Sequence, residues 1–112
     1  MLVGYGQVGG KRVLSEAAVR LGTSNLLPDG VSTRGTFAEG TGFGAGGRVG
    51  LGDQAGTFGW GGAAGTVAFA DLRRGLRAAL FTQYMPSEAY PIHGAFPAAV
   101  VKDLAAMATA QG

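Results

Sequence analysis

The chain has 112 residues, among them 22 glycines, 4 prolines and no cysteine, with a formal net charge of +2; this length fits one domain. The glycines follow no period of three, 46% of the residues are hydrophobic and only 14% are charged. Composition and charge therefore exclude collagen, a disulfide-bonded scaffold and an intrinsically disordered tail.

The first predicted element is a short helix over residues 14–22. Ser15 is a suitable N-cap, Leu14 and Val19 occupy the N′ and N4 positions of a hydrophobic staple, and Gly22 can end the helix. Residues 23–36 contain turn-forming residues and no hydrophobic period, so they are predicted to be a loop. Residues 40–66 then hold twelve glycines, interspersed with apolar residues typical of strands, namely Phe43, Val49, Leu51, Phe58 and Trp60.

The clearest strands come next. Residues 65–71 alternate in hydrophobicity, with Val67 and Phe69 on one face, and residues 76–84 form a mostly apolar run. Residues 71–75 between them have the length of a hairpin turn, in which Gly75 is free to take a positive φ.

The last segment is predicted to be a helix with an apolar stripe. Phe96, Val100, Leu104 and Met107 recur at helical spacing, and Pro97 suits the first turn. These elements predict an α+β fold over a single domain, residues 1–112. It consists of about three antiparallel strands, a short N-terminal helix and a C-terminal helix packed on one face of the sheet.

One motif, Gly4-Tyr5-Gly6-Gln7-Val8-Gly9, has the G-x-G-x-x-G spacing of dinucleotide-binding loops, where glycines let the backbone approach a pyrophosphate at a helix N-terminus. In a chain this rich in glycine the pattern arises by chance about once, and residues 42–47 match it again. No long strand precedes the motif, and no second strand ends in an acidic residue at the required distance. Dinucleotide binding through Gly4–Gly9 is therefore the least favoured alternative.

The charged and polar residues suggest few partners. Arg73, Arg74 and Arg77 form the only basic cluster, which is typical of a solvated turn, so no nucleic-acid partner is expected. With no cysteine and His93 as the only histidine, no metal centre or other cofactor is expected. No apolar run is long enough to span a membrane. Residues 1–6 lack the features of a signal peptide, and the compartment is left open.

The most informative stretch is Phe58-Gly59-Trp60-Gly61-Gly62-Ala63-Ala64-Gly65-Thr66, followed by a strand ending in Asp71 and then by Phe81-Thr82-Gln83. These residues resemble the C-terminal part of serine hydrolases related to class C β-lactamases and D-alanyl-D-alanine carboxypeptidases, in particular their esterase-like branch. The third motif of that family, Lys-Thr-Gly on a sheet strand, is often replaced in this branch by Trp-Gly-Gly or His-x-Gly. Residues 10–15 and 41–44 look like further parts of the same family, a loop into a short helix and a glycine-rich strand.

The chemistry explains why such a motif lies on a strand. An acyl-transfer enzyme needs a backbone N–H aimed at the developing oxyanion, and a free sheet edge supplies one in fixed geometry. Small residues beside that donor let a substrate lie against the strand. By resemblance, Trp60, Gly61 and Gly62 occupy the third motif, and the Ala63 N–H is one oxyanion donor. The competing interpretation is a tight edge strand with a core tryptophan and no chemistry.

The other two family motifs, Ser-x-x-Lys and Tyr-x-Asn or Ser-x-Asn, are missing. Neither Lys11 nor Lys102 has a serine three residues before it, and the single asparagine, Asn25, has Thr23 two residues before it. Because a nucleophile needs an adjacent base, no catalytic residue is assigned in this chain, and His93 is interpreted as a packing or surface residue. We expect the chain to be the C-terminal segment of a longer hydrolase, inactive when isolated. One flank of its sheet should be exposed and available for association.

The resemblance implies a small-molecule substrate, an ester or a β-lactam-like compound. In the β-lactam and peptide branches, the lysine of the third motif presents a cation to the substrate carboxylate. Trp60 stands in its place here, which favours neutral esters. The main alternative is a binding module without catalysis, whose exposed sheet edge takes a partner strand.

Overall fold

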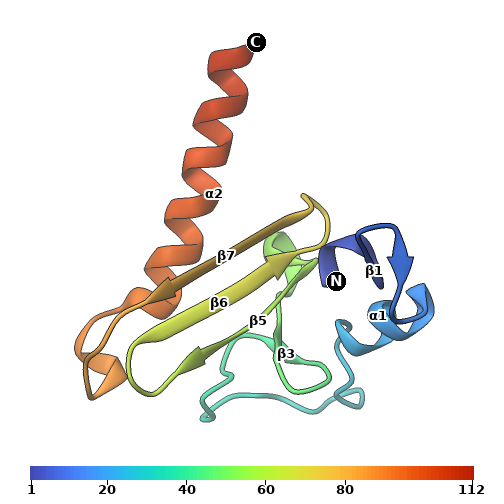
Figure 1. Cartoon of the computed structure of the whole chain (residues 1–112). Helices are drawn as coiled ribbons and strands as arrows, with labels where there is room; N and C mark the ends of the chain where they lie inside the picture. Colours follow the sequence, from blue (N-terminus) through green and yellow to red (C-terminus); the bar gives the residue numbers. More distant parts are fainter. The chain divides into compact units, whose positions relative to one another are not determined.

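The computed structural model describes all 112 residues, Met1–Gly112, and its fold is α+β, as predicted (Figure 1). It has two α-helices, α1 (Glu16–Gly22) and α2 (Ile92–Gln111). A two-stranded sheet contains β1 (Gln7–Val8) and β2 (Lys11–Arg12). The second sheet has the order β3 (Gly42–Phe43), β4 (Arg48–Val49), β5 (Thr57–Gly62), β6 (Thr66–Asp71) and β7 (Leu76–Phe81).

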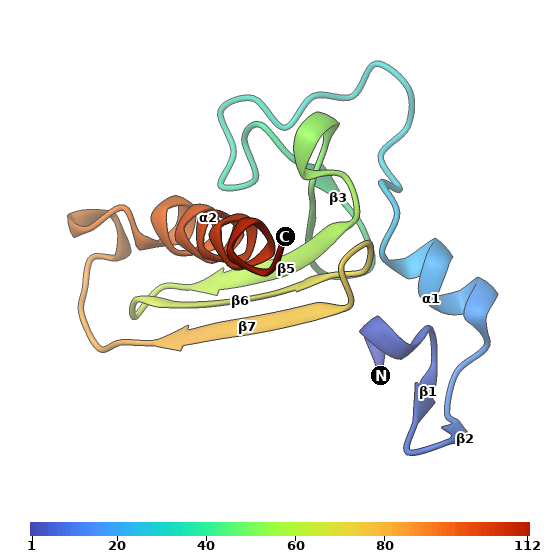
Figure 2. The ribbon, with the colours of Figure 1, turned by 90° about the horizontal axis from the view of Figure 1, so that it is seen from above.

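The larger sheet has five strands where the sequence predicted about three. Its three long strands, β5, β6 and β7, are the expected meander and lie side by side in Figure 2. The two additional strands, β3 and β4, have only two residues each, too few for a periodic pattern to be seen in the sequence. Antiparallel pairing places Val49 of β4 opposite Phe58 and Arg48 opposite Gly59. Since Arg48 is the first residue of β4, β5 runs on for three residues beyond this pairing.

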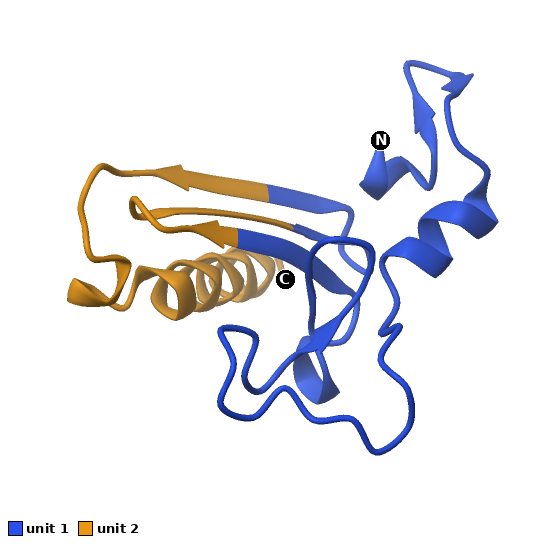
Figure 3. Ribbon diagram, turned by 90° about the horizontal axis from the view of Figure 1, so that it is seen from below, with its two compact units in different colours: residues 1–60, 70–77 blue, residues 61–69, 78–112 orange.

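The chain divides into two compact units, shown in Figure 3 and described here one at a time. The first unit comprises Met1–Trp60 and Ala70–Arg77, and the second comprises Gly61–Phe69 and Ala78–Gly112.

In the first unit, the predicted short helix is confirmed. Ser15 is its N-cap, and the Ser15 hydroxyl accepts a hydrogen bond from the Ala18 N–H at 3.1 Å. Val19 is buried, with 2% of its surface exposed, and Gly22 is the last helical residue. The chain after the helix packs closely on β3, where the Asn25 side chain accepts from the Phe43 N–H at 3.1 Å.

The β6–β7 turn of the first unit is organised by Asp71, which is fully buried. Its Oδ1 accepts hydrogen bonds from the backbone N–H groups of Arg73 and Arg74, and its Oδ2 accepts from the Arg74 guanidinium at 2.6 Å. Burial by itself raises the pKa of Asp71, but the hydrogen bonds and charge of Arg74 outweigh burial and hold that pKa below its usual value. Gly75 has a φ of 65°, as predicted for this turn.

In the second unit, Val67 and Phe69 are buried on one face of β6, as the alternating pattern predicted. The α2 helix packs there through Phe96, whose ring meets Phe69 edge-on with centroids 6.1 Å apart. Val100 and Leu104 of the predicted stripe are half-buried like Phe96, whereas Met107 at its end is 58% exposed. The C-terminal half of α2 extends beyond the strands of its own unit (Figure 1).

The predicted place of Pro97 in the first helical turn is wrong. The α2 helix begins at Ile92, with Pro91 as its N-cap, and Pro97 lies inside it. The apolar spacing identified the helix from Phe96 onward, and Ile92, four residues before Phe96, continues it; the predicted start is too late because proline is typical of the first helical turn. Pro97 has no N–H to donate to the His93 carbonyl, so this helix lacks one of its backbone hydrogen bonds.

The hydrophobic core is small. Six apolar residues are buried, whereas fifteen large hydrophobic side chains are exposed, among them Phe37, Phe81 and Met85. Phe81, at the end of the edge strand β7, is 82% exposed. An edge strand with exposed apolar side chains is a place where another chain or segment can add.

Candidate functional site on strand β5

The four predicted site residues lie at the end of β5 and in the turn that follows. Trp60, Gly61 and Gly62 are the last three residues of β5, and Ala63 is exposed in the turn to β6. The pairing with β4 stops at Gly59, so the motif begins at Trp60, the first residue of β5 beyond its pairing with β4. Backbone groups in such a place are free of the neighbouring strand, which a strand that binds substrate requires.

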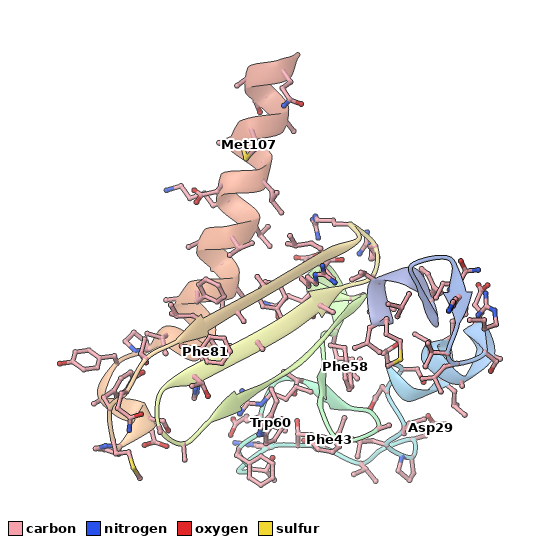
Figure 4. The ribbon with its side chains drawn as sticks, in the orientation of Figure 1. Asp29, Phe43, Phe58, Trp60, Phe81 and Met107 are labelled. Carbon is pink, nitrogen blue, oxygen red and sulfur yellow. The ribbon has the colours of Figure 1, made fainter.

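Trp60 belongs to the first unit, where it is surrounded by side chains from three other segments. Its ring meets Phe37 and Phe43 edge-on, with centroids 5.4 and 5.8 Å apart. The guanidinium of Arg48 lies over the Trp60 ring, 5.0 Å from its centroid, which is a cation–π geometry. Trp60 remains 40% exposed, so it is not the core tryptophan of the competing interpretation. Figure 4 shows Trp60 and Phe43 as neighbours.

Gly61 and Gly62 belong to the second unit, and both lie against side chains of that unit. A Cβ on Gly61 would lie 2.8 Å from Nε2 of His93, and a Cβ on Gly62 would lie 2.2 Å from the hydroxyl oxygen of Thr66. Neither position accepts a side chain without displacing its neighbour. These glycines are therefore needed for packing inside the chain, a reason that sequence analysis did not anticipate.

His93 is half-buried, and its Nε2 lies 3.0 Å from the Thr66 carbonyl oxygen. Because a carbonyl oxygen only accepts, Nε2 carries the proton. This bond connects the first turn of α2 to β6, as expected for the packing role assigned to His93. Its position on Gly61 was missed, because nothing in the sequence relates residues so far apart.

The serine hydroxyls make local hydrogen bonds. Ser15 caps α1, Ser24 donates to the Leu21 carbonyl, Ser32 accepts from the Arg34 N–H, and Ser87 donates to the Glu88 carboxylate. None of these bonds involves a lysine or His93. No group of three His, Asp or Glu side chains gathers where it could hold a metal ion.

The segment Gly4–Gly9 folds as a short 3₁₀ turn followed by the β1–β2 hairpin. Gly9 and Gly10 form the tip of that hairpin, with φ of 55° and 79°, as expected for a two-residue turn of this kind. A dinucleotide-binding loop instead connects a strand to the N-terminus of a helix. The segment does not have that arrangement.

The basic cluster is held by its own unit. The Arg73 guanidinium donates to the Ala55 carbonyl at 3.2 Å, and Arg74 is paired with Asp71. No helix combines the length and hydropathy that crossing a lipid bilayer requires.

Comparison with known proteins adds no family, since no protein-family model matches the chain and no curated protein is similar to it.

Proposed function

We propose that this chain is the C-terminal segment of a β-lactamase-related serine hydrolase of the esterase-like kind and supplies its substrate-binding strand. The observation that carries the proposal is the position of Trp60-Gly61-Gly62 at the end of β5, where pairing with β4 has stopped. The motif is followed by the meander β5–β6–β7 and the C-terminal helix, the α+β arrangement that the sequence patterns predicted.

In this proposal the nucleophilic serine and its lysine base come from residues outside the chain. The serine oxygen attacks the ester carbonyl, its proton passes to the base, and the tetrahedral intermediate carries an oxyanion. The Ala63 N–H donates to that oxyanion. The alcohol then leaves with the proton, and water hydrolyses the acyl-enzyme in a second step of the same kind. The strand therefore binds and polarises the substrate but breaks no bond itself.

Trp60 sets the substrate class in this proposal. Lysine at the equivalent place of the β-lactam branches attracts a carboxylate, whereas Trp60 offers an aromatic surface, 40% of it exposed. The hydrolase should therefore prefer neutral esters to β-lactams that carry a carboxylate.

The experiment is expression of the whole reading frame that contains these codons, followed by assays with 4-nitrophenyl butyrate and a chromogenic cephalosporin. We expect an in-frame Ser-x-x-Lys before residue 1 and ester hydrolysis by the longer polypeptide, but not by the 112-residue chain. Trp60→Lys should shift the ratio of kcat/KM towards the cephalosporin. A reading frame without Ser-x-x-Lys, or a polypeptide that hydrolyses the cephalosporin far faster than the ester, contradicts the proposal.

The exposure of β7 favours a second candidate function, a binding module without catalysis. Exposed and half-buried residues alternate along this edge strand, and Phe81 at its end is 82% exposed. An extended peptide could add to such an edge. Saturable peptide binding by the 112-residue chain, together with no ester hydrolysis by the longer polypeptide, would favour this function over the hydrolase.

A further inference from the structure

Phe37 is the most exposed member of the aromatic cluster around Trp60. Phe37 is 72% exposed, although the centroid of its ring lies only 5.4 Å from that of Trp60. Trp60 itself is 40% exposed. Both rings belong to the first unit, and together they present an aromatic surface to solvent. Exposed aromatic rings that contact one another are costly to leave in water and are typical of ligand-binding surfaces.

The loop that carries Phe37 is closed by hydrogen bonds of its own. The Thr33 hydroxyl donates to the Thr41 carbonyl at 2.8 Å, and the Thr41 hydroxyl donates to the Ala38 carbonyl at 2.7 Å. The Glu39 carboxylate accepts from the Gly35 N–H at 2.9 Å. Ala38, the next residue after Phe37, is 3% exposed. The loop is thus anchored beside Phe37, and the phenyl ring is held outward.

Arg48 connects this loop to Trp60. One of its terminal nitrogens donates to the Phe37 carbonyl oxygen, and its guanidinium lies over the Trp60 ring. Its Nε is buried and has no hydrogen-bond partner, an arrangement that costs stability. No carboxylate pairs with Arg48. The charged group of the cluster is therefore engaged by the loop carbonyl and the ring, and it holds the two aromatic residues together.

We propose that Phe37 and Trp60 form a binding site for the apolar acyl or aryl group of a neutral ester, and that Arg48 positions Phe37 against Trp60. The identification of the ligand as an ester rests on the proposed function, whereas the aromatic surface and the role of Arg48 do not.

The test uses the fluorescence of Trp60, which is the only tryptophan in the chain. The probes are ethyl, butyl and hexyl ethers of 4-nitrophenol, which are neutral, cannot be hydrolysed and quench indole fluorescence on contact. We expect saturable quenching of the 112-residue chain, with affinity rising about twofold to fourfold for each added methylene. The anion 4-nitrobenzoate should bind at least roughly tenfold more weakly than the hexyl ether. Absent quenching, no dependence on chain length, or equal binding of the anion would overturn the proposal.

Two matched substitutions distinguish the site from general hydrophobic adsorption. Phe37→Ala removes an exposed ring and should lower the affinity for the hexyl ether about tenfold without unfolding the chain. Met85→Ala removes an apolar side chain outside the cluster that is 72% exposed, as Phe37 is, and should leave the affinity unchanged. Equal losses in the two variants, or no loss in Phe37→Ala, would show that the ether does not bind at Phe37.

The positioning role of Arg48 is tested by Arg48→Met and by Arg48→Lys, which keeps the charge but lacks the planar fork. Both should lower the affinity towards that of Phe37→Ala. The double variant Phe37→Ala/Arg48→Met should lose nothing further, because Arg48 acts through Phe37. Additive losses in the double variant would overturn this role. If Arg48 variants do not fold, Phe37→Ala still decides whether the site exists.

Failure of this inference and failure of the proposed function give different results. The ethers bind without any nucleophile, so binding that depends on Phe37 supports the site even when the longer polypeptide hydrolyses no ester. Conversely, ester hydrolysis that is unaffected by Phe37→Ala supports the hydrolase and overturns the site.

Discussion

Replacing Gly61 by alanine tests the packing of His93 on the candidate strand. The added methyl carbon would lie 2.8 Å from Nε2 and 3.0 Å from Cε1 of His93, closer than such atoms pack. Because the imidazole is the end of a side chain, it can turn away, but it then gives up its hydrogen bond to the Thr66 carbonyl at 3.0 Å. That bond is worth about 1 kcal/mol, and a displaced rotamer costs about 0.5 to 1.5 kcal/mol.

We therefore expect Gly61→Ala to lower the free energy of unfolding by about 1.5 to 2.5 kcal/mol, which for a chain of this size lowers Tm by roughly 5 to 15 °C. The assay is thermal and urea unfolding followed by circular dichroism. Gly94→Ala is the matched control, since a Cβ there meets nothing within 4 Å. It should stabilise the helix by up to about 1 kcal/mol.

A second substitution tests whether His93 causes the destabilisation expected for Gly61→Ala. In the Gly61→Ala background, His93→Ala removes the ring that the methyl group meets, so it should cost less than the same substitution in the original chain. A Gly61→Ala variant as stable as the original, or purely additive effects of the two substitutions, would show that contact with His93 does not constrain residue 61. If Gly61 is also needed for the substrate to approach β5, the longer polypeptide with both Gly61→Ala and His93→Ala should hydrolyse the ester with a lower kcat/KM than the original.

Three further results are expected. Asp71→Ala leaves two backbone N–H groups and the Arg74 guanidinium without their acceptor, so urea unfolding should show a loss of about 2 to 3 kcal/mol; a loss near zero contradicts the role of Asp71. Because the pKa of Asp71 is lowered in the folded chain, its stabilisation is complete above about pH 4 and disappears as the pH falls through that lower pKa. Asp71→Asn should therefore lose less stability in acid than the original chain. An identical loss would show that protonation of Asp71 does not cause the loss of stability in acid. The isolated chain should melt at a Tm that rises with concentration, and Phe81→Lys should weaken this dependence; a sharp melt independent of concentration contradicts it.

Local patterns predicted the elements whose conformation depends on neighbours in sequence. Ser15 as N-cap, the β6–β7 turn with Gly75 at positive φ, and Val67 and Phe69 on one face all agree with the structure. For the cap and the turn the decisive interaction lies within a few residues, such as the hydrogen bond from Ala18 to Ser15. Val67 and Phe69 share a face because the side chains of a strand alternate. The α+β class followed from these elements.

The start of α2 and the short strands β3 and β4 could not be predicted in this way. Ile92 continues the apolar spacing of α2, but Pro97 is a residue typical of a first helical turn. The actual first turn also holds His93, which donates to the Thr66 carbonyl on another element. The strands β3 and β4 form because Phe43 and Val49 find partners in Arg48 and Phe58. His93 and Thr66 lie 27 residues apart, so their hydrogen bond depends on the completed fold. The pairs Phe43–Arg48 and Val49–Phe58 are close in sequence, but strands of two residues show no periodic pattern.

The position of the candidate motif follows from the sequence alone, because a strand, two glycines and a hairpin turn are local features. What surrounds each residue of that motif depends on tertiary packing. It placed Phe37, Phe43 and Arg48 around Trp60 and the ring of His93 on Gly61. The physical reason is that side-chain packing depends on the distance between atoms in space, which separation along the chain does not reveal.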